Sequence, residues 1–226
     1  MGGYWIPSDL APLRRVIVHE PGAEIENVTP DTAAEALFDD VLFLEPARAE
    51  HRQMVAVLAR CAEVLPLRRL LAEVLADAAV ARPLLAALCE RAGHPDLAPA
   101  LAERPPADLV DAILGGVPER RDTFAQFVAP SHFALPPQPN AFFTRDPAFC
   151  LGHRAFVGAF ARDVRATERD VLRAVLRHHP ALGEPVVDLG ARGGAAASIE
   201  GGDVCAVRDD LVVVGYSERT SVAGID

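Results

Sequence analysis

Lysine is missing from this sequence of 226 residues, in which all 22 basic residues are arginine. Aspartate and glutamate together number 32, so the formal net charge is −10 at pH 7. A chain with this excess of negative charge is not expected to bind nucleic acid or an anionic membrane, whereas it suits a cationic small molecule. Half of the residues are hydrophobic and 24% are charged, which predicts a globular protein with a sizeable core.

Cysteine is scarce and widely spaced. The four cysteines, at positions 61, 89, 150 and 205, form no CxxC pair and no zinc-type spacing. Reduced, buried thiols in a cytoplasmic protein are the natural interpretation of such a pattern.

Long apolar runs are also absent. No segment approaches the roughly 20 apolar residues that a membrane-spanning helix needs. The first 15 residues, MGGYWIPSDLAPLRR, contain no apolar core of a signal peptide. Residues 190–194, GARGG, are rich in glycine, but they match neither GxGxxG nor the lysine-containing phosphate loop. We therefore expect neither a membrane partner nor a phosphate-binding site.

The first part of the chain has an α/β pattern. A short apolar strand in residues 14–22 stops at Pro-Gly, residues 46–62 have the period of a helix, and residues 63–67 form a second strand. From Arg68 to about Val117 nearly every segment is helical, with breaks at proline and glycine. Strands flanking a helix predict an α/β fold, and the segment that follows predicts a compact block of short amphipathic helices.

Strands return after residue 130. The pattern predicts strands at residues 141–145, 155–160 and 185–189, with a helix from Thr167 that uses Asp170 as a capping pair. Two further strands, at residues 204–207 and 211–215, are joined at Asp209-Asp210 as a hairpin. The order strand–strand–helix–strand is thus complete once, partial in the first segment, and begins a third time at Ser198.

Two acidic residues stand beside expected strand ends. In PNAFFTRDP (139–147), the aromatic pair favours a strand and the second proline ends it, so Asp146 is delivered to the strand's end. In IEGGD (199–203), Glu200 precedes two glycines, which allow close approach of another group to the backbone. Taken singly, each acid is more typical of a tight turn than of a functional site.

Taken together, Asp146 and Glu200 suggest a binding site. If the repeated units surround an axis, the two carboxylates converge, and paired carboxylates suit a planar guanidinium. Asn140, Arg165 and Arg219 lie near expected strand ends and could bind the polar tail of such a ligand, since arginine is the natural partner of a carboxylate. Each arginine alone is more typical of a solvated surface residue.

Four segments resemble the arginine deiminase family, within the guanidino-group-modifying superfamily of pentein fold. They are APLRRVIVHEPG (11–22), LFDDVLFLEPARAEH (37–51), PNAFFTRDP (139–147) and SIEGGD (198–203) with the GYSERTS that follows at 215–221. The resemblance implies an α/β propeller, here about two units and the start of a third, with an inserted small α-helical domain. The implied divisions are residues 1–67 (first unit), 68–130 (helical insertion) and 131–226 (second unit and start of the third).

The resemblance also implies a reaction. Members of this family hydrolyse L-arginine to L-citrulline and ammonia through a cysteine-linked intermediate, with no metal or organic cofactor. By position, Asp146 matches the residue that binds the guanidinium and Glu200 matches the catalytic glutamate. Arg165 and Arg219 match the arginines that bind the substrate's carboxylate, and Asn140 faces its amino-acid end. A homo-oligomer is expected only for the full-length enzyme.

The chain departs from the family's pattern in one respect. The family carries its catalytic histidine in a His-x-Asp motif downstream of the SERT segment and its nucleophilic cysteine near the C-terminus. All seven histidines precede the SERT segment, and the one that is followed two residues later by Asp, His94, lies in the helical block. Cys205 reads as a buried structural thiol. We therefore expect an N-terminal portion that is inactive alone. A related amidinotransferase, a substituted-arginine hydrolase and a non-catalytic remnant of the fold stay open as alternatives.

Overall fold

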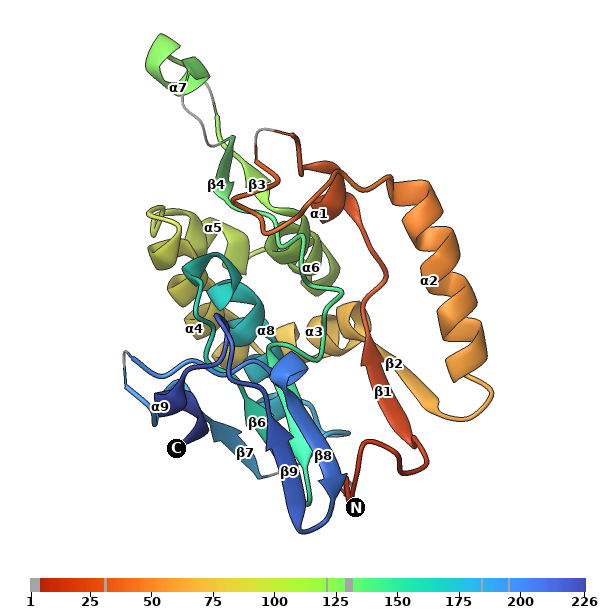
Figure 1. Ribbon diagram of the computed structural model, residues 1–226. Coiled ribbons are helices and arrows are strands. Elements are labelled where there is room, and N and C mark those ends of the chain that lie inside the picture. Colours follow the sequence, from red (N-terminus) through yellow and green to blue (C-terminus); the bar gives the residue numbers. More distant parts are fainter. Residues whose placement is uncertain (1–4, 31, 121, 129–131, 184, 195) are drawn as a thin grey trace. The chain divides into compact units, whose positions relative to one another are not determined.

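The computed structural model describes residues 5–30, 32–120, 122–128, 132–183, 185–194 and 196–226 (Figure 1). The chain divides into two compact units. The first comprises residues up to His19, Val55–Leu70 and Phe143–Asp226, and the second comprises Glu20–Met54 and Leu71–Phe142. These are units of packing, so the predicted propeller units and their boundaries stay predictions.

The first unit contains a parallel strand pair and a three-stranded sheet. Strand β1 (Arg15–Val18) pairs in parallel with β2 (Glu63–Pro66). Strands β5 (Ala148–Leu151), β6 (Arg154–Val157) and β7 (Val186–Asp188) lie in the order β5-β6-β7, with β5 antiparallel and β7 parallel to β6. Parallel neighbours need a crossover connection, which the 13-residue helix α8 (Ala166–His178) supplies between β6 and β7.

Local sequence explains this sheet. The two-residue turn between β5 and β6 begins at Gly152, whose φ of 54° lies in the left-handed region that glycine reaches without strain. Helix α8 buries Val171, Leu172, Val175 and Leu176, which recur at the helical period, as the sequence predicts. A second apolar cluster joins the sheet to the hairpin: Phe149, Ile199 and Val204 are buried together.

The hairpin of the first unit is formed by β8 (Val204–Arg208) and β9 (Leu211–Val214), an antiparallel pair that was predicted from the sequence. Among the described residues β9 pairs with β8 alone, so it is an edge strand, and its Val212 and Val213 are 41% and 53% exposed. The 3₁₀ turns η1 (Asp163–Arg165) and η2 (Gly201–Asp203) precede α8 and β8, and a short helix α9 (Val222–Ile225) follows the hairpin.

The second unit is mainly helical. It holds α1 (Ala23–Glu26), α4 (Ala78–Arg91), α5 (Leu97–Ala102), α6 (Pro106–Gly115) and α7 (Phe124–Val128). A small antiparallel pair, β3 (Val117–Pro118) and β4 (Phe133–Leu135), completes it. Helices α2 (Leu44–Leu58) and α3 (Leu67–Leu75) run across the division between the units. The α/β class and the helical block predicted from the sequence are therefore confirmed.

Two predicted local features are wrong. Residues 141–145 form consecutive turns rather than a strand, because prolines at positions 136, 137, 139 and 147 remove the N–H groups and dihedral freedom that a ladder requires. Thr167 and Asp170 do not cap α8: the helix begins after Arg165 without a side-chain cap, and Asp170 is buried against Arg173, 2.9 Å away.

The prediction of buried thiols is wrong for two cysteines. Cys61 lies just beyond the end of α2 and is exposed, and Cys205 is exposed on β8. Successive strand side chains point to opposite faces, so Cys205 points away from its buried neighbours Val204 and Ala206. Among the described residues, every helix is too short or too polar to cross a membrane.

Candidate functional site

The turn that ends in Asp146 is fixed by hydrogen bonds in the first unit. The backbone N–H of Asp146 donates to the carbonyl of Phe143 (3.2 Å), and the Asp146 carbonyl accepts from the N–H of Gly201 (3.0 Å). The neighbouring Arg145 side chain donates to the carbonyls of Gly201 (3.1 Å) and Val204 (2.7 Å). The 139–147 segment is therefore bonded directly to the segment that carries Glu200.

Two glycines make this close approach feasible. A Cβ atom on Gly201 would overlap the carbonyl oxygen of Arg145, and one on Gly202 would lie 2.7 Å from Oδ1 of Asp146. A side chain at Gly201 would push the two segments apart, and one at Gly202 would displace the Asp146 carboxylate. The sequence indicated a close approach at these glycines, and the group that approaches them is the turn that bears Asp146.

The backbone of Glu200 is fixed by a hydrogen bond, whereas one oxygen of its carboxylate, Oε2, has no hydrogen-bond partner. Glu200 is 3% exposed and lies between the bridge of Ile199 with Ala159 and the turn η2, so it precedes β8 rather than ending a strand. Its N–H donates to Oγ1 of Thr220 (3.3 Å). Its Oε2 is buried and has no hydrogen-bond partner. A buried acceptor left unpaired carries a desolvation cost, which a ligand's donor would relieve.

Arg165 lies among three carboxylates. Its Nη1 is 2.8 Å from Oδ2 of Asp146 and 3.6 Å from Oε2 of Glu200. Its Nε and Nη2 both donate to Oε2 of Glu168, at 3.0 and 2.8 Å. The guanidinium carbon also lies 4.6 Å from the ring centroid of Phe160, within cation–π range. The Arg165 side chain is 4% exposed, so its guanidinium is shielded from water, whereas Asp146 is 15% exposed.

A hydrogen-bonded loop carries Arg219 to the same place. Oδ2 of Asp203 accepts from the hydroxyls of Ser217 and Thr220, both at 2.7 Å. Oγ of Ser217 in turn accepts from the N–H of Arg219 (3.0 Å). Thr220 is fully buried and bonds both Asp203 and Glu200. The loop is thus fastened to the turn η2 through Asp203.

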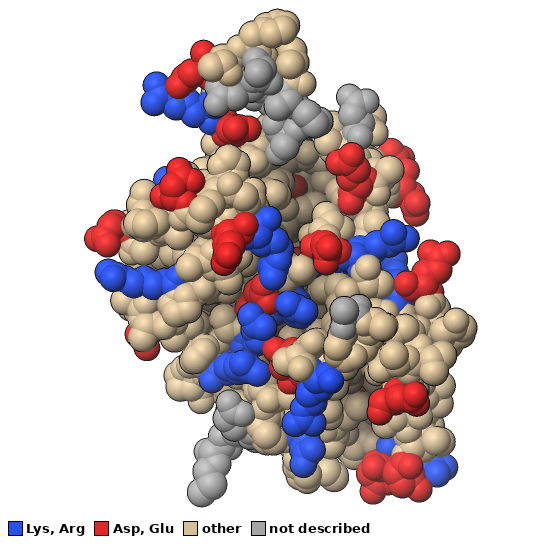
Figure 2. Space-filling model, turned by 90° about the vertical axis from the view of Figure 1, so that its left-hand side faces the viewer, with Lys and Arg blue, Asp and Glu red and all other residues tan. Residues whose placement is uncertain are grey.

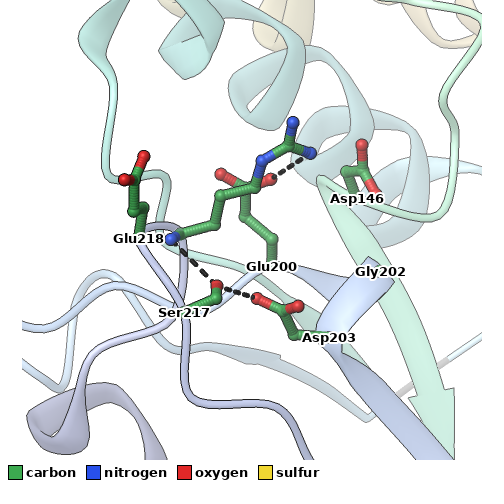
Figure 3. A pocket seen from close by; sticks show the side chains of 7 residues that line it. Asp146, Glu200, Gly202, Asp203, Ser217 and Glu218 are labelled. Atoms are coloured by element: carbon green, nitrogen blue, oxygen red, sulfur yellow. Dashed lines mark hydrogen bonds and ion pairs between the residues drawn. The ribbon is translucent and has the colours of Figure 1, made fainter.

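These segments line an open cavity of about 380 Å³, which is in the size range of small-molecule sites. Figure 3 shows the carboxylates of Asp146 and Glu200 at this cavity, with Ser217 bonded to Asp203 beside them. Its lining residues are Asp146, Glu200, Gly202, Asp203, Ser217, Glu218 and Arg219. The expectation that Asp146 and Glu200 face a common cavity is met.

The electrostatics favour a cation in this cavity. Arg219 is 60% exposed, and its Nη1 is 3.8 Å from Oε2 of Glu200, too far for a hydrogen bond. Burial raises the pKa of Glu200, against the attraction of Arg165 and Arg219. Burial likewise raises the pKa of Glu168 to about 7 against the attraction of Arg165, and the like charges of Asp146 and Glu200 raise it further. A bound cation would stabilise the ionised form of these carboxylates.

The outer surface carries no single field of one sign on the face drawn in Figure 2, where acidic and basic side chains are interspersed. Among the described residues, no group of three or more His, Cys, Asp and Glu side chains is placed to hold a metal ion. The charged side chains that line the cavity, rather than a field of one sign on this face, would therefore attract a ligand.

The predicted site residues fall into three groups. Asp146, Glu200 and Arg219 line the cavity. Arg165 contacts the two carboxylates but does not line the cavity, so its expected contact with a ligand's carboxylate is not supported by the geometry. Asn140 belongs to the second unit, where its amide donates to the carbonyl of Ala36 (2.8 Å).

The sequence alone missed three residues that shape the site. Glu168 reads as a surface residue of a helix, three positions from Arg165, and nothing in the pattern shows that both are buried. Asp203 and Thr220 read as turn residues. The one usable signal was the joint presence of EGGD and SERT, whose polar side chains bond each other in the structure.

No cysteine or histidine is among the residues that line the cavity. Cys150 is the most strongly perturbed thiol, and burial raises its pKa to about 11. A thiol with a raised pKa is a poor nucleophile because little of it is ionised near neutral pH. The described lining can therefore hold a cation, but it contains no thiol that could attack one covalently.

Comparisons with known proteins agree with this chemistry. Residues 116–226 match the family model "Arginine deiminase". The chain is 31% identical to the arginine deiminase of Limosilactobacillus fermentum (strain NBRC 3956 / LMG 18251), over 98% of this chain and 58% of that protein. It is 32% identical to the arginine deiminase of Streptococcus sanguinis (strain SK36), over 97% of this chain and 58% of that protein.

Among solved structures, the chain is similar to a dimethylarginine dimethylaminohydrolase variant in an adduct with S-methyl-L-thiocitrulline. The TM-score is 0.48 and the sequence identity 15%, over 94% of this chain and 54% of that one. The chain thus spans a little over half the length of the curated relatives it matches.

Proposed function

Because the chain is related to the arginine deiminases over nearly all of its own length, we propose that it carries the guanidinium-binding part of an arginine deiminase. The whole protein would hydrolyse L-arginine to L-citrulline and ammonia. The observation that carries the proposal is the pair of carboxylates, Asp146 and Glu200, that meets at one cavity with an unpaired Oε2 on Glu200.

Each lining residue has a role in this proposal. The carboxylates of Asp146 and Glu200 accept hydrogen bonds from the N–H groups of the substrate's guanidinium and balance its charge. Arg219, which is mostly exposed at the cavity, binds the substrate's carboxylate. Asn140 stays a predicted contact for the amino-acid end of the substrate.

The chemical step needs a thiolate. The resonance-stabilised guanidinium carbon is a poor electrophile, and covalent attack by cysteine divides its hydrolysis into two easier steps. A histidine would supply the proton to the departing ammonia. Since neither residue type lines the cavity, we propose that the 226 residues bind L-arginine without converting it, and that the nucleophile belongs to a segment outside them.

We also propose a pentein propeller fold, with residues 68–130 as its helical insertion. The proposed location is the cytoplasm, and the full-length enzyme is proposed to form a homo-oligomer. Free thiols at all four cysteines support the cytoplasm, since disulfides are rare there. The parallel pairs β1–β2 and β6–β7, each bridged by a helix, support repeated units.

The test is calorimetric titration of the 226-residue chain with L-arginine. Asp146→Asn and Glu200→Gln should each weaken binding by about tenfold or more, since a hydrogen bond to a charged group contributes roughly 1.5–3 kcal/mol. Asp210→Asn, in the exposed hairpin turn, is the matched control and should bind as the unmodified chain does. An unmodified, folded chain that binds no L-arginine would contradict the proposal.

A parallel assay for citrulline checks the catalytic half. The 226-residue chain should form none above background, whereas robust turnover would identify one of its thiols as a nucleophile. Cys205→Ser would then be the first variant to test, because Cys205 is exposed and follows the EGGD segment directly.

A further inference from the structure

Arg145, the arginine of the FTRDP segment, directly precedes Asp146 but is not among the residues that line the cavity. Its side chain is 50% exposed. Four hydrogen bonds nevertheless join its guanidinium to the rest of the first unit. An exposed arginine that is bonded at several points of its planar fork is a fixed part of the local structure.

Two of these bonds bracket the turn η2, which directly follows Glu200. Nε of Arg145 donates to the carbonyl of Gly201 at the start of the turn (3.1 Å), and Nη2 donates to the carbonyl of Val204 just past its end (2.7 Å). The N–H of Gly201 donates in turn to the carbonyl of Asp146 (3.0 Å). Both backbone groups of Gly201 are thus bonded to the consecutive residues 145 and 146.

Asp9, which is distant in the sequence, fixes the outer end of the Arg145 side chain. Its Oδ2 accepts from Nη2 of Arg145 (2.9 Å) and its Oδ1 from Nη1 (3.4 Å), so the ion pair is bidentate. Asp9 is itself fastened to β8: its N–H donates to the carbonyl of Ala206 (2.7 Å), and its Oδ2 accepts from the N–H of Ala206 (3.1 Å). The N-terminal segment therefore runs beside β8 (Figure 1) and forms an Asp9–Arg145 clamp.

The clamp acts where the sheet does not. Residues 144–147 form a turn rather than a strand, so Asp146 depends on its turn for its position. A binding site requires its groups to be held within about 0.5 Å of the productive geometry. The clamp and the bond from Gly201 to Asp146 join the turn that carries Asp146 to the segment that carries Glu200, and so hold the two carboxylates at a fixed separation.

We infer that Arg145 is a positioning residue, held by Asp9, that sets the spacing of the Asp146 and Glu200 carboxylates. The N-terminal segment thereby determines how well the site distinguishes a guanidinium from an ammonium group. This inference rests on the proposed function and narrows it. A guanidinium needs two aligned acceptors for its fork, whereas an ammonium is a compact point charge that tolerates a displaced carboxylate.

The test is titration of three ligands into the 226-residue chain and into the variants Asp9→Asn and Arg145→Lys. The ligands are L-arginine, L-argininamide, in which an amide replaces the carboxylate, and L-lysine, in which an ammonium replaces the guanidinium. Asp9→Asn should weaken L-arginine and L-argininamide by the same factor, about fivefold, and L-lysine by less than about twofold. Arg145→Lys has no fork and should give the same pattern with a loss of about tenfold.

Three controls separate positioning from a general structural effect. Because Asp9 acts through Arg145, the double variant should bind L-arginine no more weakly than Arg145→Lys alone. Asp9→Glu keeps the carboxylate and should retain most of the affinity. Asp210→Asn makes the same change as Asp9→Asn at an exposed bidentate pair with Arg208 (2.8 and 3.3 Å), and it should bind all three ligands as the unmodified chain does.

Two results would overturn the inference and leave the proposed function intact. One is an unchanged affinity of Asp9→Asn for L-arginine, and the other is an equal loss for all three ligands. If the unmodified, folded chain binds no L-arginine, the proposed function itself fails, so the failures are distinguishable. Asp9 is 27% exposed at the side chain, so Asp9→Asn gives the decisive comparison even if Arg145→Lys does not fold.

Discussion

Both units of the chain bury apolar side chains, and the first also buries a cluster of opposite charges. In the first, Arg165 and its partners Asp146, Glu168 and Glu200 form an interior of charges, none of them more than 15% exposed at the side chain. In the second, α4 and α6 bury Leu84, Leu85, Leu88, Leu109, Val110, Ile113 and Leu114. The first interior depends on charge balance and hence on pH, whereas the second depends on apolar area and packing.

This difference separates stability from function. An apolar core can be repacked with little effect on ligand specificity. Removal of one member of a buried charge cluster should reduce both ligand binding and the stability of the fold. The comparison can be followed experimentally because the single tryptophan, Trp5, belongs to the first unit, stacked on His153 with ring centroids 4.4 Å apart. Its fluorescence reports that unit, while far-UV circular dichroism reports the helices of both.

Substitution of Arg165 by methionine should have the largest effect. Three buried carboxylates lose their shared counter-charge, and removing one partner of a buried ion pair typically costs about 3–5 kcal/mol. We expect a urea midpoint for Trp5 fluorescence that falls sharply at pH 7 and recovers partly at pH 5, below the raised pKa of Glu168, which is about 7. Arg208→Met, at an exposed ion pair, is the control and should leave the midpoint unchanged. Equal midpoints for both variants would contradict the description of a charge-balanced interior.

Truncation of Leu85 to alanine should be next in size. Leu85 is fully buried in α4, and a Leu→Ala change in a core costs about 2–5 kcal/mol. We expect a lower thermal unfolding midpoint, followed by far-UV circular dichroism. The affinity for L-arginine should be unchanged at temperatures where the chain is folded. A large loss of affinity would show that the helical unit supports the site, which would break the comparison.

The pH dependence of stability should follow Glu168. Its pKa is about 7 in the folded chain and near 4.5 when unfolded, so the folded state keeps its proton at pH values where the unfolded chain has lost it. The stability gained is complete below about pH 4.5 and is lost as pH rises to about 7, on the order of 3 kcal/mol. Urea unfolding between pH 5 and pH 8 should show this slope.

Two variants sharpen that measurement. Glu168→Gln removes the titrating group and should flatten the slope over this range. Leu85→Ala should lower stability equally at every pH and keep the slope of the unmodified chain. Identical slopes in the unmodified chain and in Glu168→Gln would assign the pH dependence to other residues.

Thr220→Val should have the smallest effect of the four. Valine keeps the shape of threonine and removes the hydroxyl that bonds Asp203 and Glu200, leaving buried groups unpaired at a cost of about 1–3 kcal/mol. Because the loop also carries Arg219, the substitution should weaken the binding of L-arginine more than the binding of L-argininamide. Each affinity is compared with that of the unmodified chain. Thr220→Ser retains the hydroxyl and should restore most of both properties; failure to do so would point to packing alone.

Much of the fold was readable from apolar periodicity. The strands at β1, β2, β6 and β7 and the core face of α8 follow from it, and so does the hairpin at Asp209-Asp210. The predicted strand at 141–145 failed because aromatic residues favour strands only where neighbouring backbone can pair, and the surrounding prolines prevent this.

Part of the candidate site could also be predicted from the sequence. Asp146 and Glu200 could be placed together because each stands beside an expected strand end of a repeated unit, and because both segments resemble the arginine deiminase family. The role of Arg165 could not be read, since RATE at positions 165–168 is indistinguishable from an exposed ion pair on a helix surface. Burial of that pair depends on packing by Phe160 and on the turns that carry Asp146 and Glu200, which are tertiary contacts.

Strand β9 has a consequence for how the protein behaves at high concentration. Its four residues, LVVV, carry no charge and no proline, and its outer edge has no strand partner among the described residues. Such an edge is a template for pairing with another chain. Refolding should therefore compete with a second-order reaction, so that the yield of native protein falls as the starting concentration rises. A single lysine at Val213, the most exposed residue of the strand, would act as a gatekeeper and make that yield independent of concentration.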